Sequence, residues 1–212
     1  MTEKLPFHAH PKLPMHPPKA TVPAEPVLAM QLDGNGRYHK LSAGGTVPAE
    51  RCWLHLDYSA ESAREWLNTS PLVPDVIRHA LLGESNRPKL VKVNNGLQLT
   101  LRGINHNEGQ RPDHMVAIRF YITDQLIVST RHRRVYAVEQ VVRNLRQGLG
   151  PKSTADWLVD VCENLAEQAG DFIDELMDKI VLLEDEILEH RIPSRRELVE
   201  IRRQLIVLRR YL

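Results

Sequence analysis

Apolar residues recur at helical spacing through the last third of the chain. They are separated by steps of three or four residues, at Leu158, Cys162, Leu165, Ala169, Phe172, Leu176, Ile180, Leu183 and Ile187. This periodicity predicts one amphipathic helix from Thr154 to His190, with a drift away from a strict heptad near its middle. With a rise of about 1.5 Å per residue it is roughly 55 Å long, so we expect it to project or to bridge.

Capping signals mark the ends of this helix and the start of another. A Gly-Pro pair at 150–151 interrupts the preceding segment, and Ser153–Asp156 has the spacing of an N-terminal capping box. Pro193 closes the helix, and Ser194–Glu197 is a second capping box. No C-cap signal follows, so this second helix is expected to continue past the last residue. Its predicted apolar stripe is Leu198, Ile201, Leu205, Leu208 and Leu212.

The region between Val27 and Gly150 mixes strands with short helices. Alternating and apolar runs predict strands at 27–33, 51–57, 97–102, 115–122 and 125–130, and helices at 59–67, 74–82 and 135–147. Because these elements show no regular βαβ alternation, we expect an α+β domain, a three-layer α/β/α sandwich with a mixed sheet. The predicted organisation is an arm at 1–26, this domain at 27–150, and long C-terminal helices at 151–212 that form a stalk or funnel.

The predicted arm is rich in proline and histidine. Seven of the 14 prolines fall within residues 1–26, together with His8, His10 and His16. This composition is typical of a disordered segment. The three imidazoles could bind a divalent cation, but ordering the arm would cost much of the binding energy, so an inert tail is the favoured interpretation.

Composition excludes several classes of protein. The chain is 42% hydrophobic and 26% charged, enough to bury a core in one or two domains. Two separate cysteines, Cys52 and Cys162, indicate a reducing compartment rather than a disulfide framework, and Cys162 is expected to pack in the core. No apolar run approaches the ~18 residues of a membrane span, and no signal peptide is visible, so we expect a soluble fragment.

A net charge of +1 hides an opposition between the two long helices. Residues 171–190 carry eight acids and one lysine, whereas residues 191–212 carry seven arginines and two glutamates. Such opposed charges could set the pairing of an antiparallel helix pair or a ring of such pairs.

Signatures of catalysis are missing, so an enzyme is not expected. There is no HExxH, GxSxG, Walker loop or paired CxxC. His55 with Asp57, and His114 beside Asp113, are more easily explained as satisfied polar residues than as bases or ligands. The basic run 131–134 favours a solvated strand end or a partner for the acidic helix. Nucleic-acid binding is not favoured, because only 5% of the residues are aromatic.

Carboxylates on the first long helix are the candidate metal ligands. Asp171, Asp174, Glu175 and Asp178 are three or four residues apart, so they share a helix face and could hold a hydrated divalent ion, especially across a subunit boundary. Glu186 and His190, four residues apart, form a pair better suited to zinc. The competing interpretation is a solvated acidic face paired with the arginines downstream.

Several motifs in a common order resemble one protein family. They include Trp53–Tyr58 (WLHLDY), Gly83–Lys89 (GESNRPK), Arg111–Asp113 (RPD), Ile127–Arg133 (IVSTRHR) and Gln204–Tyr211 (QLIVLRRY). Glu65–Leu67 (EWL), Leu101–Asn105 (LRGIN) and Trp157–Asp160 (WLVD) extend the likeness, which covers about residues 27–212. In these motifs the chain resembles the cytoplasmic part of CorA-type divalent-cation transporters, and more narrowly their ZntB-type zinc-transporting branch.

The resemblance implies a homopentamer on the cytoplasmic side of the bacterial inner membrane. The long helices would form its intracellular funnel, with residues 194–212 at the start of a stalk. Two transmembrane helices and a Gly-Met-Asn signature would follow. Zn²⁺, or Mg²⁺ or another divalent cation, would be the transported or regulatory ion. We hypothesise that ions held by the acidic helix bias how neighbouring subunits pack, and so bias the pore.

Two other functions remain open at this stage. A soluble coiled-coil adaptor would explain the long helices without a membrane. A nucleic-acid-binding protein would use the arginine-rich helix, although the resemblance implies no nucleic-acid partner.

Overall fold

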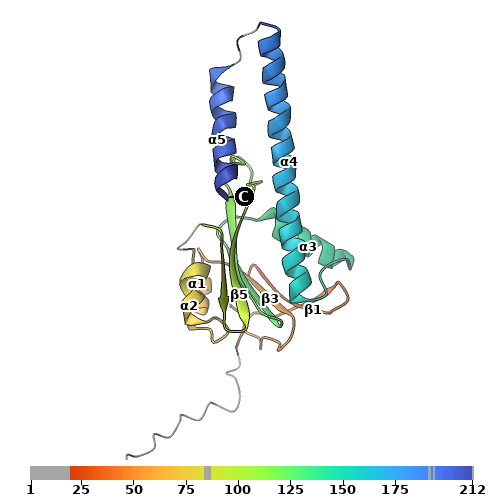
Figure 1. Cartoon of the computed structure of the whole chain (residues 1–212). Coiled ribbons are helices and arrows are strands. Elements are labelled where there is room, and N and C mark those ends of the chain that lie inside the picture. The colour runs from red at the N-terminus through yellow and green to blue at the C-terminus, as the bar shows by residue number, and fades with distance from the viewer. Residues whose placement is uncertain (1–19, 84–86, 191, 193, 212) are drawn as a thin grey trace, which may run out of the picture.

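The computed structural model describes residues 20–83, 87–190, 192 and 194–211. The predictions for His8, His10 and His16, for the closing Pro193 and for Leu212 concern residues outside these ranges. Three layers make up most of the described chain, and two antiparallel helices project beyond them (Figure 1).

The middle layer is a seven-stranded sheet in the order β2-β1-β3-β7-β6-β5-β4. Only β3 and β7 pair in parallel, and all other neighbours are antiparallel. The sheet is therefore mixed. Its strands are β1 (Leu28–Leu32), β2 (Tyr38–Lys40), β3 (Cys52–Asp57), β4 (Lys89–Val93), β5 (Gly96–Gly103), β6 (Val116–Ile122) and β7 (Leu126–Arg131).

The central strands are buried on both faces, which explains their continuous apolar runs. Leu54 and Leu56 of β3 belong to a core cluster with α1 (Glu61–Thr69) and α2 (Asp75–Leu81). Trp53 points to the opposite face, into a cluster with α3 (Tyr136–Gln147) and the first turns of α4 (Thr154–Leu188). We call the sheet, α1, α2, α3 and α4 up to Leu165 the three-layer body.

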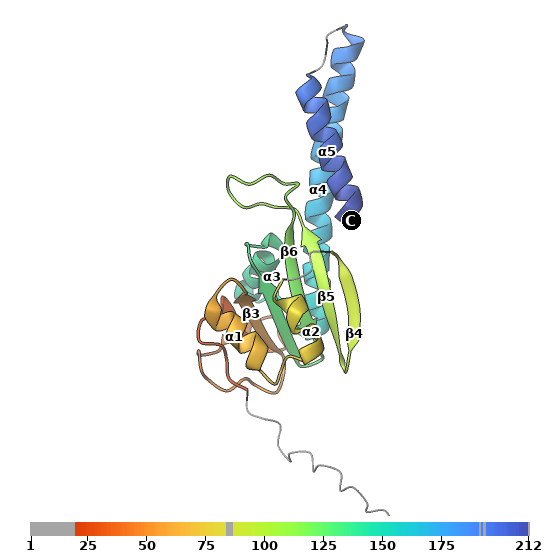
Figure 2. The same ribbon diagram turned by 90° about the vertical axis from the view of Figure 1, so that its left-hand side faces the viewer.

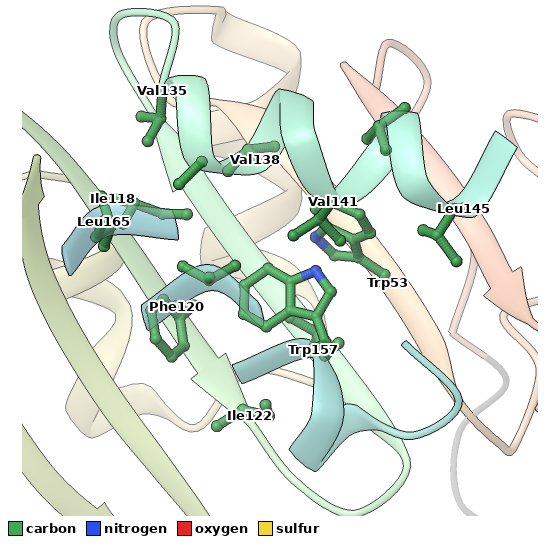
Figure 3. Packing of buried hydrophobic residues seen from close by; sticks show 14 of the residues in the cluster. Trp53, Ile118, Phe120, Ile122, Val135, Val138, Val141, Leu145, Trp157 and Leu165 are labelled. Atoms are coloured by element: carbon green, nitrogen blue, oxygen red, sulfur yellow. The ribbon is translucent and has the colours of Figure 1, made fainter. Parts of the chain in front are cut away.

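An aromatic group anchors α4 to the body. The Trp157 ring lies edge-on to Trp53, with ring centroids 5.1 Å apart, and to Phe120 at 5.3 Å (Figure 3). All three side chains are fully buried. The helix begins at the predicted capping box, where Asp156 N donates to Ser153 Oγ and Ser153 N donates to the Asp156 carboxylate. These contacts determine where α4 starts and in which direction it leaves the sheet.

Beyond the body, α4 continues past the end of the sheet and α5 (Arg195–Tyr211) returns beside it (Figure 2). We call α4 beyond Leu165 together with α5 the hairpin. A small cluster joins its base to the sheet. The cluster contains Ile104, Met115, Phe172, Leu176 and Leu208. No described helix is long and apolar enough to cross a membrane.

The fold class predicted from the sequence is confirmed: helices cover both faces of a mixed sheet, and long C-terminal helices follow. Each predicted strand or helix of the body occurs within two residues of its expected ends. The sequence analysis missed β2 and β4. Both lie at edges of the sheet and are mostly exposed, so they lack the apolar alternation by which a strand is recognised.

Two side-chain predictions for the long helices are wrong. Cys162 is exposed, because the buried stripe of α4 starts from Trp157 and Val161 instead of Leu158. On α5, the predicted stripe is buried at Ile201 and Leu208, but Leu198 and Leu205 are 46% and 42% exposed. The helix is turned so that Gln204, which is buried, faces the body in their place.

Candidate functional site on the hairpin

The predicted metal ligands form an exposed stripe along α4. Asp171, Asp174, Glu175 and Asp178 are all exposed. Each residue of a helix turns by about 100°, so Asp171, Asp174 and Asp178 lie on the side of α4 away from the buried Phe172 and its neighbours. Glu175, three residues after Phe172, lies at the border between the two sides. The carboxylates are thus directed away from the contacts that hold α4 to the body.

A single copy of the chain does not bring these carboxylates together with other ligands. Within the described residues, no three His, Cys, Asp or Glu side chains could share a metal ion. None of the four carboxylates has a hydrogen bond or ion pair with another described side chain. The pairing with downstream arginines is also not formed, since no ion pair among the described residues joins α4 to α5.

The second candidate pair, Glu186 and His190, does not lie on one continuous helix. The sequence predicted a helix to His190, but α4 ends at Leu188 and Glu189 is its C-cap. His190 has a φ of +63°, in the left-handed region, and therefore leaves the helical path. The i, i+4 geometry on which the pair was predicted is not present.

Glu186 instead lines a groove between the two helices of the hairpin. The groove has a volume of about 340 Å³. Leu183 and Ile201, both buried, form part of its walls. Its polar lining is Lys179, Glu186, Glu197, Glu200 and Gln204. The two helices therefore meet through apolar contacts near the body and leave a mainly acidic groove farther out.

A cluster of charges fastens α5 to the loop between β5 and β6, and we call it the clamp. The side chain of Asp113 is fully buried, with Oδ1 3.0 Å from Arg111 Nε and Oδ2 3.2 Å from Arg203 Nε. Arg111 also pairs with Glu200 of α5. These hydrogen bonds, first to Glu200 and then to Asp113, raise the pKa of the Arg111 guanidinium. The clamp thus holds α5 by ion pairs from both sides.

Neighbouring polar contacts extend the clamp. His114 Nε2 lies 3.1 Å from an Arg203 terminal nitrogen, within hydrogen-bonding distance. Gln204 donates to Glu200 at 3.0 Å. Asp113 Oδ1 and His114 Nε2 have partners, in line with the predicted role as satisfied polar residues. Asp113 Oδ2 lies within ion-pair distance of Arg203 but has no hydrogen bond among the described residues. The signal for the clamp was the RPD motif, but its partners on α5 are nearly 90 residues away and were not found from the sequence.

The buried His55 also has a structural role. Its Nδ1 lies 2.8 Å from Ser129 Oγ, which accepts a hydrogen bond from Trp53 Nε1 at the same distance. Burial, aided by the charge of Arg131, lowers the pKa of His55 to about 3, so the ring is neutral. Asp57 is satisfied by Ser59, whose backbone N–H donates to it at 2.9 Å.

The basic run 131–134 does not contact the acidic helix in the described chain. Arg134 pairs with Glu139 of α3 at 2.6 Å, and Arg133 donates to Gln110 in the clamp loop at 2.5 Å. This run therefore acts as a solvated strand end, one of the two roles predicted for it.

Comparison with known proteins identifies the relatives of this chain. Residues 48–212 match the family model for CorA-like Mg²⁺ transporter proteins. The chain is 47% identical over 195 residues to the zinc transport protein ZntB of Yersinia pseudotuberculosis, covering 92% of this chain and 60% of that protein. It is 48% identical over 187 residues to ZntB of Pectobacterium carotovorum, covering 88% and 57%. The chain thus spans about 60% of the length of these relatives.

Solved structures share the fold. The full-length CmaX protein superposes with a TM-score of 0.81 at 27% identity, covering 89% of this chain and 60% of that one. The cytoplasmic domain of ZntB from Vibrio parahaemolyticus gives a TM-score of 0.73 at 22% identity, covering 88% and 74%.

Proposed function

The chain belongs to the family of CorA-like Mg²⁺ transporter proteins, and from this premise we propose that it is the cytoplasmic part of a membrane transporter for divalent cations. The observation that carries the proposal is 47% identity over 92% of the chain to proteins named for zinc transport. Zn²⁺ is therefore the proposed cargo, and Mg²⁺, named in the family description, is the second. The described chain would bind cations and transmit their occupancy to the pore, with no catalytic step.

Exposed apolar residues on the hairpin support assembly with further copies. One side of α4, next to the acidic stripe, carries four apolar residues that are 41% to 75% exposed: Ile173, Met177, Val181 and Leu188. We call them the second apolar stripe. Covering such surface contributes about 25 cal/mol per Å². We propose that the hairpins of neighbouring copies pack along this stripe to form the wall of a funnel, in a homopentamer.

Metal binding at the acidic stripe would then take place between copies. A neighbour packed on the second apolar stripe lies close to Asp174 and Asp178, and it adds its own side chains to theirs. Carboxylate oxygens suit hydrated divalent ions. We propose that this arrangement makes Asp171, Asp174, Glu175 and Asp178 a regulatory site, with Glu186 and His190 available to Zn²⁺ near the tip of the hairpin.

The same proposal places the body and the hairpin on the cytoplasmic side of the bacterial inner membrane. The relatives have a further 40% of their length outside the match. That remainder would supply the transmembrane helices and the pore. Ion occupancy in the funnel would shift the packing of the hairpins and hence the population of open pores.

Zinc flux tests the transport proposal. The whole protein, reconstituted in liposomes that contain a zinc-sensitive dye, should admit Zn²⁺ when a gradient is applied, and empty liposomes serve as the control. An adaptor or a nucleic-acid-binding protein would produce no flux above the control, and that result would reject transport.

Calorimetric titration of this chain with Zn²⁺ tests the regulatory site separately. We expect binding that is weakened by the triple substitution of Asp171, Asp174 and Asp178 with Asn. The matched control replaces the exposed Glu61 and Glu65 of α1 with Gln and should bind as the unaltered chain does. Absence of zinc binding by the unaltered chain would reject the regulatory site while leaving transport standing.

A further inference from the structure

A basic cleft lies where the last turn of α5 meets the end of β5 and the start of β6. It consists of two hollows of about 490 Å³ and 200 Å³, and Arg102, Met115 and Arg133 line both. The larger hollow continues along α5 to Arg210 and Tyr211. The smaller one is lined by side chains from the loops after β3 and β7 and from the start of β6, including Tyr58, Arg119 and His132. We call the two hollows together the arginine cleft.

Three of its guanidinium groups lie against aromatic rings, and one of them is that of Arg210, whose Cζ atom lies 5.3 Å from the centre of the Tyr211 ring. The Arg102 Cζ atom lies 4.7 Å from the centre of the Tyr211 ring, and the Arg119 Cζ atom lies 5.3 Å from that of Tyr58. Arg119 is only 1% exposed. Burial, and less strongly the charge of Arg119, lower the pKa of Arg102. Positive charge is thus concentrated at a position where water screens it poorly.

The hydrogen-bonding capacity of Arg102 is not used within the described chain. Its Nε atom is buried and has no hydrogen-bond partner among the described residues. Leaving a buried donor of a charged group without a partner is costly, so such donors are usually satisfied by a ligand, an ion or water.

Charge is also unbalanced across the described lining of the cleft. Among the described residues that line the cleft, the one carboxylate is that of Asp113, and it already pairs with Arg111 and Arg203 in the clamp. Arg102, Arg133 and Arg210 have no ion pair with a described carboxylate. Three guanidinium groups that line the cleft therefore have no anion from the described chain as a partner.

We propose that the arginine cleft binds a phosphate-bearing anion, with a diphosphate group bridging the two hollows across Arg102. Guanidinium groups match phosphate oxygens with paired, charge-assisted hydrogen bonds, and the aromatic rings keep them oriented. Because Arg210 and Tyr211 belong to α5 while Arg102 belongs to β5, the bound anion would fasten the end of α5 to the sheet. This inference does not depend on the transport proposal.

Calorimetry of this chain with inorganic pyrophosphate tests the site. We expect saturable binding of one pyrophosphate per chain, and Arg102→Gln should weaken it by about tenfold or more, as expected for the loss of charge-assisted hydrogen bonds. Arg133→Gln and Arg210→Gln, both at exposed positions, should weaken it severalfold. Arg146→Gln on α3 and Arg202→Gln on α5 are matched controls and should leave the affinity unchanged.

Parallel titrations distinguish the source of the phosphate. Tighter binding of ATP than of pyrophosphate would identify a nucleotide site, and the reverse order would identify a site for the free diphosphate. Sulfate at equal ionic strength should bind at least about tenfold more weakly than pyrophosphate, because it carries only two charges and has a single tetrahedral group.

Two results would overturn the proposal. One is the absence of binding by pyrophosphate, phosphate and ATP at millimolar concentration. The other is binding that all five substitutions weaken equally, which would indicate general attraction to basic surface. If Arg102→Gln fails to fold, the Arg133 and Arg210 substitutions decide between these outcomes.

Discussion

The body and the hairpin share one helix but use it in opposite ways. Within the body, Trp157 of α4 is fully buried between Trp53 and Phe120. Five turns farther along the same helix, Met177 is 52% exposed, and Val181 is 50% exposed. The part of α4 in the body thus buries its large aromatic residue within one chain, whereas the hairpin presents a row of apolar side chains beside a line of carboxylates. This difference is what the proposed assembly explains, since neighbouring copies would cover the exposed side chains of the hairpin.

The largest expected effect is in the body. Trp157→Ala removes a fully buried ring and leaves a cavity, so we expect the free energy of unfolding to fall by about 3–5 kcal/mol. Met177→Ala on the hairpin is the control and should change the stability of a single chain by less than about 0.5 kcal/mol. Urea denaturation measures both. Equal losses from the two substitutions would show that the hairpin is packed as tightly as the body.

The second-largest effect is expected in the clamp, because it joins the body to the hairpin. Asp113→Asn removes a buried negative charge from between two arginines that are 40% and 48% exposed. Solvent can partly stabilise those arginines, so we expect a loss of about 2 kcal/mol. Hydrogen exchange should accelerate in α5 and stay unchanged in β3. The control is Asp124→Asn in the exposed turn after β6. Unchanged exchange in α5 would contradict the assigned role of the clamp.

Acid should weaken the body through His55. Its pKa is 6.5 in the reference state and about 3 when folded, so between these pH values the unfolded chain binds the extra proton. Stability must therefore fall as the pH decreases from about 6.5 to 3, by up to about 1.4 kcal/mol per pH unit. His55→Gln should reduce this slope, measured by urea denaturation at several pH values. His39→Gln on the edge strand β2 should retain it, and an unchanged slope in His55→Gln would contradict the assignment.

Sequence reasoning predicted the body well because its elements are decided locally. The central strands are buried on both faces, and the capping box at Ser153 marks the start of α4 independently of distant residues. The edge strands β2 and β4 were missed because pairing with a neighbour, rather than their own composition, makes them strands.

The hairpin was harder to predict because its contacts are distant in sequence. Leu198 and Leu205 have the spacing of a buried stripe, yet Gln204 is buried in their place. Glu200, on the same side of α5 as Gln204, pairs with Arg111, a residue 89 positions away that the apolar pattern of α5 does not reveal. Likewise, the spacing of Asp171, Asp174, Glu175 and Asp178 indicates a shared face, but no sequence pattern shows which other ligands converge on it. In the proposed assembly, those ligands would come from other copies of the chain.

Sedimentation equilibrium tests most directly whether copies of the chain cover the hairpin. The account predicts a mass that rises above that of one chain with concentration, and rises further with Zn²⁺. Met177→Gln should weaken association by about 1 kcal/mol, roughly fivefold. Leu90→Gln on the exposed strand β4 should have no effect. A mass of one chain at every concentration, with and without Zn²⁺, would contradict the account.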